Sequence, residues 1–308
     1  MKQWTRQVLK SQLNDEAAML RTLREAYHSA FLDVSARIEK LLERETIGKG
    51  NVLQLRYQRR IRKVIWEVLG KLDSGAYKSI EAYMRDCYTS GALGAMYSLQ
   101  RQGVPLLLPI DAVKVTASLT DKALLEVTLS KRLYKHVETM AATIQQELTR
   151  GVVQGSQWKD IARNIEARSN VGLRHAYTIA RTEGHRVTEE ARFDTLTEAQ
   201  EYGVKVYKRW NAALDDRTRI HHIMLDGQTV PMDEPFRVAG LTAMYPGAFG
   251  IPEEDINCRC TFEEVAKWEI DEDLARTKYD GKAGRIINVG KASTFDEFKR
   301  DYWKKFSV

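Results

Sequence analysis

Cysteine is scarce in this sequence, and its three copies are poorly spaced for disulfide bonds. The 308 residues contain only Cys87, Cys258 and Cys260. An odd number, with two of the three separated by a single residue, does not make the framework of a disulfide-stabilised secreted protein. We therefore expect a protein that is made in the reducing cytoplasm of a cell.

Long apolar runs are also missing. The segment after Met1 carries Lys2, Arg6 and Lys10 where a signal peptide has an apolar core. The run Val104–Ile110 is far shorter than the roughly 20 residues that a membrane-spanning helix needs. With 6 prolines and 19 glycines, the chain also lacks the composition of a disordered protein. We expect a folded protein of about two domains with no membrane partner.

The charges nearly balance, so no strongly acidic or basic character dominates. Lysine and arginine number 48 against 42 acidic residues, which gives a net charge of +6. This small excess permits double-stranded DNA as a non-specific partner without requiring it. The densest basic run places four residues within about one helix face, where they either contact phosphate or form a solvated surface: Arg56, Arg59, Arg60 and Lys63.

Helical patterning dominates residues 1–205, because apolar residues recur there at helical spacing and helix breakers are rare. Gly and Pro clusters predict breaks at 48–51 and 72–75, a stop at Gly103 and Pro105, and a turn at 151–155. An extended connector is expected at 105–110 and a helix N-cap at Ser156. The predicted helices cover residues 11–45, 52–72, 77–101, 120–150, a short segment after Ser156, and 173–202, which ends at Gly203. The helix over 120–150 has an apolar stripe: Leu124, Leu125, Val127, Leu133, Val137, Met140 and Ile144.

The helix predicted over 173–202 carries a narrow stripe of small residues, which lets another helix approach closely. The stripe consists of Ala176, Ala180, Gly184, Val187 and Ala191. From Val204 to Glu264 the β-branched content rises, and turn residues recur every few positions, which predicts a loop-rich unit of short strands. The fold class is therefore mainly α, a long-helix region followed by a small α+β unit. We expect a helical region over 1–170, the small unit over 171–265 and a charged tail over 266–308.

Three segments of the C-terminal half stand out by their residue types and order. The first is Ile179–Glu183 on the long helix. The second is Trp210–Gly227, and the third is Pro252–Cys260, which ends in Asn-Cys-Arg-Cys. The residues that define these segments are Arg181, Thr182, Glu183, Trp210, Asp215, Arg217, Thr218, His222, Asp226, Gly227, Asn257, Cys258, Arg259 and Cys260.

Together the three segments resemble the Mu F-like minor head proteins of tailed bacteriophages, a phage head morphogenesis family. The resemblance covers about residues 145–262, and no single segment is specific alone. It implies a low-copy structural component of the virion, placed in the head interior or at the portal vertex. It also implies the portal protein and the major capsid or scaffolding protein as partners, and a role in head assembly, DNA packaging or delivery.

Two accounts of the cysteine and histidine residues stay open. Cys258, Cys260, His221 and His222 supply the thiolate and imidazole ligands that structural zinc prefers. Some family members carry cysteine at the position of Arg219, and a guanidinium there disfavours a cation. The alternative is a metal-free polar core in which the cysteines are buried beside Asp215, Arg217 and His222. We expect this polar core, with His222 close to the Cys258–Cys260 loop and no cofactor.

Several side-chain partners follow from the same segments. Asp215 or Asp216 is expected to pair with Arg217 or Arg219 and so to order the loop before His222. Glu183 is a candidate partner for Arg217 or Arg259. Trp210 is expected to anchor the core of the small unit.

Enzymatic activity is not expected. A metal-dependent nuclease of the HNH-like class is the nearest alternative, but no histidine follows His222 to complete such a site. A cysteine hydrolase using Cys258 or Cys260 with His222 lacks an activating motif around the nucleophile. A stand-alone DNA-binding protein is the remaining alternative, which differs from a head component only in its partner.

Overall fold

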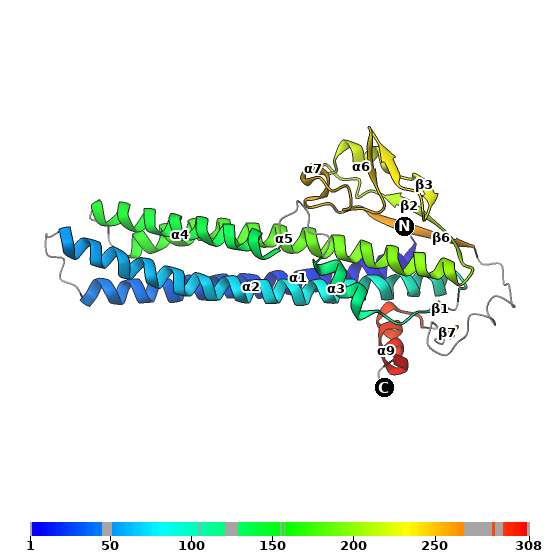
Figure 1. Cartoon of the computed structure of the whole chain (residues 1–308), viewed down its shortest axis with the longest axis horizontal. Helices are drawn as coiled ribbons and strands as arrows, with labels where there is room; N and C mark the ends of the chain where they lie inside the picture. The colour runs from blue at the N-terminus through cyan, green and yellow to red at the C-terminus, as the bar shows by residue number, and fades with distance from the viewer. Residues whose placement is uncertain are drawn as a thin grey trace. The chain divides into compact units, whose positions relative to one another are not determined.

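The computed structural model describes most of the chain (Figure 1). The chain divides into two compact units. One unit comprises residues 1–16, 83–126 and 181–308, and the other comprises residues 17–82 and 127–180. We call them the mixed unit and the helical unit. The residues described are 2–44, 51–104, 106–120, 129–154, 156, 158–267, 285–286 and 292–306.

Long helices make up most of the described residues, so the predicted mainly α fold class is confirmed. The first five are α1 (Gln3–Arg44), α2 (Asn51–Arg101), α3 (Ala112–Thr120), α4 (Leu129–Val153) and α5 (Trp158–Glu201). None of the described helices is apolar enough over a sufficient length to cross a membrane.

The helical unit is held together by apolar side chains at helical spacing on four helices. Ile38 and Ile65 are completely buried, and Ile165 is 1% exposed. The core of this unit includes Leu23, Val34, Ile61, Leu69, Leu72, Ile80, Leu133, Val137, Ile144, Leu148, Ile161 and Ala176. Of the stripe predicted for residues 120–150, Leu133, Val137, Met140 and Ile144 are buried, whereas Leu124, Leu125 and Val127 lie outside the described residues.

The predicted break at residues 72–75 is wrong, because α2 continues through it. Gly75 lies on the solvent side, and a Cβ built on it would meet nothing within 4 Å. A glycine in a helix costs only about 1 kcal/mol relative to alanine. Burial of Leu72 and Ala76 on either side outweighs that cost.

The predicted separation of two helices before residue 173 is also wrong. A single helix, α5, runs from Trp158 to Glu201, and α4 extends through Gly151 to Val153. Ile161 and Ile165 are buried and extend the buried face of α5 toward its N-terminus, ahead of the stripe that begins at Ala176. This burial explains why the helix does not stop before residue 173. The short helix α3 was not predicted, while the ends near Gly103 and Gly203 were, and both glycines have positive φ.

The mixed unit contains the strands, all paired antiparallel. The central sheet has the order β3–β2–β6, and β4 pairs with β5 and β1 with β7. The strands are β1 (Leu106–Leu107), β2 (Lys205–Asn211), β3 (Thr229–Pro231), β4 (Phe236–Val238), β5 (Leu241–Ala243), β6 (Thr261–Lys267) and β7 (Arg285–Ile286). The short helices are α6 (Ile220–Leu225) and α7 (Pro252–Asp255), and α9 (Phe295–Phe306) closes the described chain.

Within the mixed unit, the sheet lies along the C-terminal part of α5, and α9 lies on the other side of the helices (Figure 1). We call residues 204–267 the β module. On the α9 side, the ring of Tyr97 lies 5.6 Å from that of Phe295 and 5.4 Å from that of Phe298. The strand-rich character predicted for residues 204–264 is confirmed, whereas the division at residues 170 and 265 stays a prediction.

The small-residue stripe of α5 serves close approach, as expected. All of its members are buried. A Cβ on Gly184 would lie 2.5 Å from Cε1 of Tyr83 on α2. A Cβ on Gly91 of α2 would lie 2.4 Å from the carbonyl oxygen of Thr188 on α5. In the mixed unit Gly91 therefore lets the backbones of α2 and α5 meet, and Gly184 makes room for the Tyr83 ring.

Candidate functional site

The structure brings the three sequence segments together at one end of the β module. Thr182 on α5 accepts a hydrogen bond from the backbone N–H of Asn257 at 3.1 Å. The guanidinium of Arg259 donates two hydrogen bonds to the carboxylate of Asp215, one of them at 2.6 Å and the other shorter. Residues 75 and 44 positions apart in the sequence are thus joined by specific polar contacts.

Hydrogen-bonded turns on both sides of α6 fix the loops that carry these residues. Asp215 accepts hydrogen bonds from the backbone N–H of Arg217 at 3.0 Å and from the hydroxyl of Thr218 at 3.1 Å, just before α6 begins. Asp226, after α6, accepts the backbone N–H of Ala212 at 2.8 Å. Gly227 follows with φ +78°, which glycine adopts without strain.

The loop before Cys258 is built around a buried carboxylate. Asp255 accepts the backbone N–H groups of Phe249 at 3.0 Å and Gly250 at 2.7 Å. Asn257 then has φ +55°, a conformation that asparagine adopts more readily than most residues. This sharp turn directs Cys258 and Cys260 into the interior.

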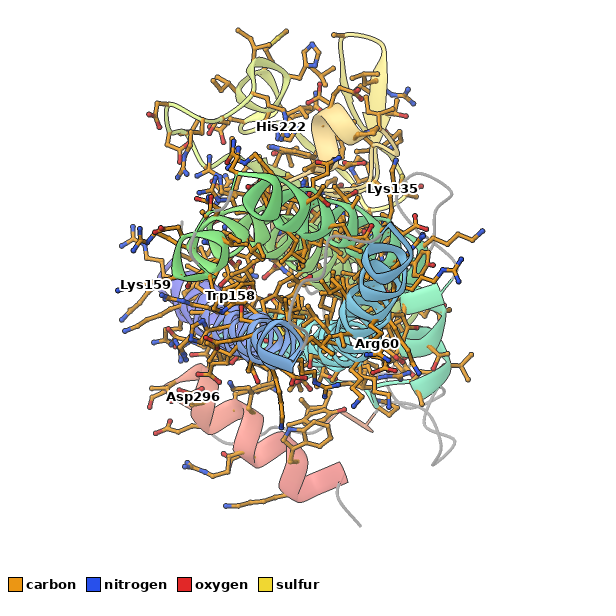
Figure 2. The ribbon with its side chains drawn as sticks, turned by 90° about the vertical axis from the view of Figure 1, so that its left-hand side faces the viewer. Arg60, Lys135, Trp158, Lys159, His222 and Asp296 are labelled. Carbon is orange, nitrogen blue, oxygen red and sulfur yellow. The ribbon has the colours of Figure 1, made fainter. Side chains whose placement is uncertain are left out.

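His222, Cys258 and Cys260 form a buried cluster, as the sequence predicted. The Nδ1 atom of His222 lies 3.1 Å from Sγ of Cys260 and 3.7 Å from Sγ of Cys258. The three residues are at most 5% exposed. We call them the His–Cys cluster, and Figure 2 shows His222 within the β module.

The two cysteines differ in their tendency to ionise. Hydrogen bonding from Cys258, together with the interaction with His222 and the backbone of Ala213, lowers the pKa of Cys260 to about 4. The same interaction with Cys260, together with burial, raises the pKa of Cys258. The interaction between the two sulfur atoms therefore favours the thiolate form at Cys260 over the thiolate form at Cys258.

Aromatic rings enclose the imidazole of His222. The ring of Phe249 stacks on it at 5.6 Å between centroids, and the ring of Trp210 meets it edge-on at 5.7 Å. Trp210 is 1% exposed and also contacts Phe236, so the predicted role of Trp210 as a core anchor is confirmed.

Glu254 is the residue of this site that the sequence analysis missed. Its Oε2 atom lies 3.1 Å from Nε2 of His222, and its Oε1 atom lies 2.6 Å from Nδ1 of His221. Glu254 is buried although it belongs to a run of three acidic residues that looks like a solvated turn. His221 faces this carboxylate, and the structure does not bring it into the His–Cys cluster.

Of the ion pairs expected for Asp215, one is replaced by other contacts and one is present. Arg219, expected beside Asp215 or Asp216, donates to the main-chain carbonyls of Ile256 at 2.6 Å and Glu254 at 3.2 Å. Asp215 has Arg259 as its main partner, and the Arg217 guanidinium lies 3.8 Å away. The pairing of Asp215 with Arg217 is thus confirmed as the weaker contact.

The partner expected for Arg259 was Glu183, and the structure places Asp215 there instead. Glu183 bonds at 3.0 Å to Arg186, one turn further along α5. Arg186 also donates to Glu190 at 2.7 Å. Because both partners lie on the same buried helix face, the local pairing prevails over the distant one.

A second buried network fixes the β module to α5. Arg192 donates to the carbonyl oxygen of Phe262 at 2.7 Å, to Glu264 at 3.0 Å and to Glu189 at 3.2 Å. Glu189 in turn accepts the hydroxyl of Thr261 at 2.8 Å. The sequence showed these charges beside the small-residue stripe, but it did not show that they face strand β6.

The basic run near the start of α2 is only partly described. Arg59, Arg60 and Lys63 are exposed, whereas the side chain of Arg56 lies outside the described residues. Lys63 is 77% exposed and lies 3.8 Å from Glu67. Figure 2 shows Arg60 on α2 and Lys135 on α4, both in the helical unit.

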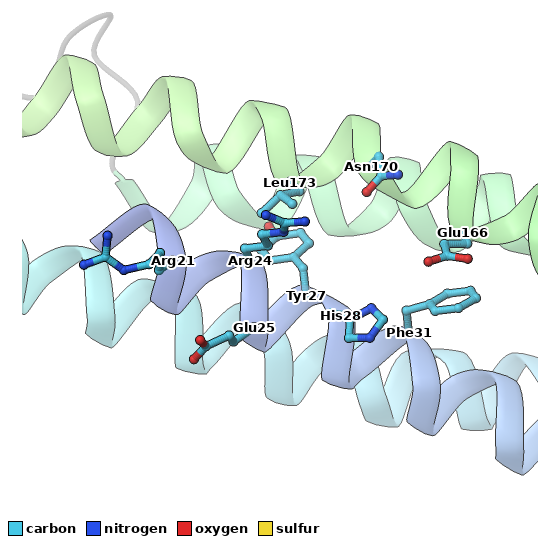
Figure 3. A pocket seen from close by; sticks show the side chains of 9 residues that line it. All are labelled: Arg21, Arg24, Glu25, Tyr27, His28, Phe31, Glu166, Asn170 and Leu173. Atoms are coloured by element: carbon cyan, nitrogen blue, oxygen red, sulfur yellow. The ribbon is translucent and has the colours of Figure 1, made fainter. Parts of the chain in front are cut away.

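The helical unit also has a groove of about 520 Å³ between α1 and α5 (Figure 3). Arg24 and Tyr27 of α1 lie near Leu173 of α5, and Phe31 lies near Glu166. Basic and acidic side chains both line this groove, and none of the motif residues reaches it. The groove therefore shares no residue with the candidate site.

Comparison with known proteins places the site within a recognised domain. Residues 142–263 match the family model described as Phage Mu protein F like protein. The chain is 28% identical over 226 residues to minor head protein GP7 of Bacillus phage SPP1, covering 73% of this chain and 70% of that protein. It is 29% identical over 280 residues to a protein of Enterococcus faecalis named NAD(+)–arginine ADP-ribosyltransferase EFV, covering 90% of this chain.

The matches differ in how much of each relative they span. The chain spans 55% of the enterococcal protein. It is also 31% identical over 119 residues to an uncharacterised protein of Haemophilus influenzae, 38% of this chain and 23% of that protein. No solved structure shows significant similarity to the chain. The family match contains the whole of the candidate site.

Proposed function

Because residues 142–263 match the family model described as Phage Mu protein F like protein and the chain is similar to a phage minor head protein, we propose that it is a minor structural component of a phage head that acts by binding. In this account it associates with the portal protein and with the inner capsid or scaffolding protein. Its contribution is to head assembly, DNA packaging or delivery.

The observation that carries this proposal is the interlocking of the three motif segments. The Thr182–Asn257, Asp215–Arg259 and His222–Cys260 contacts all fall within the family match. Each contact joins loops or helices to one another inside the fold. Residues used in this way build a rigid module for a binding surface, in keeping with the name of the SPP1 relative.

The burial of the His–Cys cluster supports binding over catalysis. A catalytic group has to reach its substrate, and Cys260 and His222 are 1% and 2% exposed. The transferase name belongs to the enterococcal protein, of which this chain spans about half. We propose that the region shared with this chain serves association with heads, and that the chain itself transfers no ADP-ribose.

DNA contact is a further part of the proposal. The exposed basic side chains of Arg59 and Lys63 are available to phosphate, and the net charge is positive. Such contact would be independent of base sequence, because lysine and arginine on a helix face neutralise backbone charge without reading bases.

The test is a complementation experiment. The gene for this chain is deleted from the genome that encodes it and is resupplied as wild type, as Arg259→Ala or as Asp216→Ala, a control at an exposed neighbouring position. Deletion is expected to lower the yield of infectious particles, and wild type and Asp216→Ala to restore it. Arg259→Ala is expected to restore it incompletely. Full infectivity without the gene would contradict the proposal.

Transferase activity is tested separately with the purified chain and labelled NAD⁺. The expected result is no transfer of label to protein above the level without the chain. Transfer that depends on the chain would replace a binding function by an enzymatic one.

A further inference from the structure

We propose that His222, Cys258 and Cys260 bind a zinc ion that ties helix α6 to the loop preceding strand β6. Among the residues that the structure describes, these three form a group whose potential ligand atoms all lie within 4.8 Å of one another. The inference concerns the stability of the β module and does not depend on the role proposed for the chain in phage heads.

The distances suit a tetrahedral zinc site. With Zn–S near 2.3 Å and Zn–N near 2.0–2.1 Å, ligand atoms in a tetrahedron lie about 3.5–3.8 Å apart. The Nδ1 atom of His222 is 3.1 Å from Sγ of Cys260 and 3.7 Å from Sγ of Cys258. The second distance lies within this range, and the first is shorter than it.

The surroundings of the cluster have the features of an outer ligand shell. A zinc-binding histidine usually directs its second ring nitrogen at a carboxylate, which fixes the ring and its tautomer. Here the Nε2 atom of His222 lies 3.1 Å from Oε2 of Glu254. Backbone groups of Ala213 and Cys260 also interact with the two sulfur atoms, as N–H groups do around metal thiolates.

Charge balance favours the metal-bound state. Zinc carries two positive charges and two cysteine thiolates carry two negative ones, so the bound unit is neutral. A neutral unit suits the enclosure formed by Trp210 and Phe249 around His222. Without a cation, a buried thiolate would have to be compensated by hydrogen bonds and the imidazole alone.

The sequence disfavoured zinc because of Arg219, and the structure removes that objection. The Arg219 guanidinium is engaged by the carbonyl oxygens of Glu254 and Ile256. His221, expected as a fourth ligand, is directed at Glu254 instead. Within the described part of the chain, the site therefore has three protein ligands, and His221 does not supply a fourth.

Metal content is the direct test. The full chain is produced with zinc in the medium, purified without chelator and analysed for metals. We expect about one zinc per chain in the wild type and near-complete loss in Cys260→Ser and His222→Gln. Cys87→Ser is the matched control, because Cys87 is also buried but lies on α2 and is not part of the cluster. This variant should keep its zinc.

A second measurement uses the wild-type chain and so does not depend on how the variants fold. Removal of zinc with a chelator should lower the melting temperature, and added Zn²⁺ should restore it. Co²⁺ in place of zinc should give thiolate-to-cobalt charge-transfer bands and the visible bands of a tetrahedral site. Glu254→Gln should keep the site but weaken zinc affinity by about 10–100-fold.

Other outcomes overturn the proposal. Wild-type chain without zinc and without cobalt bands, but with a normal melting transition, would show a metal-free polar core. Recovery of Cys258 and Cys260 as a disulfide after anaerobic purification would show a redox pair instead.

Discussion

At the scale of single residues, buried charges connect the β module to α5. Arg192 and Glu264 are almost completely buried, and burial raises the pKa of Glu264 while the charge of Arg192 opposes that rise. The Glu264 carboxylate thus depends on its partner to remain charged. Isolated surface pairs, by comparison, add little to stability.

We predict that Arg192→Met destabilises the protein by about 3–5 kcal/mol, because Glu189 and Glu264 would be left buried without a counter-charge. The control is Arg181→Ala on the same helix, where a half-exposed side chain pairs with Glu16 at 2.7 Å. That change should cost less than about 1 kcal/mol. Denaturant unfolding measures both, and equal losses would contradict the assigned role of Arg192.

The Asp215–Arg259 pair predicts a specific response to acid. Hydrogen bonds from Arg259 hold the pKa of Asp215 well below its usual value of 3.8. The unfolded chain therefore takes up this proton at higher pH than the folded one. The stabilising contribution is present above the unfolded pKa and is lost as the pH falls below it.

Accordingly, Asp215→Asn should flatten the decrease in melting temperature between about pH 5 and pH 3. Asp216→Asn, at the exposed neighbouring position, should leave the wild-type profile unchanged. Parallel profiles for wild type and Asp215→Asn would show that the pair does not contribute to folding.

Residue types allowed some of these contacts to be predicted and not others. The approach of His222 to Cys260 followed from ligand-forming residues in two of the three segments. The choice of Asp215 over Glu183 as the partner of Arg259 did not, because several acidic residues lie within reach in sequence and only the turn at Asp215 selects one. Glu254 was missed because its burial depends on α7 folding over α6.

At the scale of elements, helix continuity is decided by burial more than by local helix breakers. Residues 72–75 look like a turn, yet α2 passes through them because Leu72 and Ala76 are buried. The same holds for α5, whose apolar stripe begins at Ile161. Helix ends at Gly103 and Gly203 were predicted correctly, because a positive φ in each place requires glycine.

A pair of glycine substitutions on α2 tests this account. Gly75→Ala should stabilise the protein by about 0.5–1 kcal/mol, since the added methyl group meets open space and alanine favours helix. Gly91→Ala should destabilise it by about 1–3 kcal/mol, because the methyl group would collide with the backbone of Thr188. Thermal unfolding compares the two; stabilisation by Gly91→Ala would mean that α2 and α5 do not meet there.

At the scale of the whole molecule, two compact units share one chain, and the family match includes residues of both. The fold class was predictable because helical periodicity extends over most of residues 1–205. Which stretches of the chain make up each unit was not predictable, because each unit combines residues from distant parts of the chain. Long-range packing of this kind leaves no local pattern.

The exposed basic residues near the start of α2 give a prediction about DNA binding by the whole chain. Double-stranded DNA should bind without sequence preference and weaken steeply from low to moderate salt. Replacing Arg59, Arg60 and Lys63 by glutamine should reduce the slope of affinity against salt. Glutamine at Lys159 and Arg163, exposed basic residues on α5, provides the control. An unchanged slope in the first variant would place the DNA contact elsewhere, and no binding at low salt would remove DNA from the proposed partners.

The central claim is that this chain is a minor component of a phage head. The most direct measurement is quantitative mass spectrometry of heads purified from the genome that encodes it, with the portal protein as the internal reference. The account predicts that the chain is present in a constant ratio to the portal protein across independent preparations, and far below the major capsid protein. Its absence from purified heads, while it is abundant in the producing cells, would contradict the account.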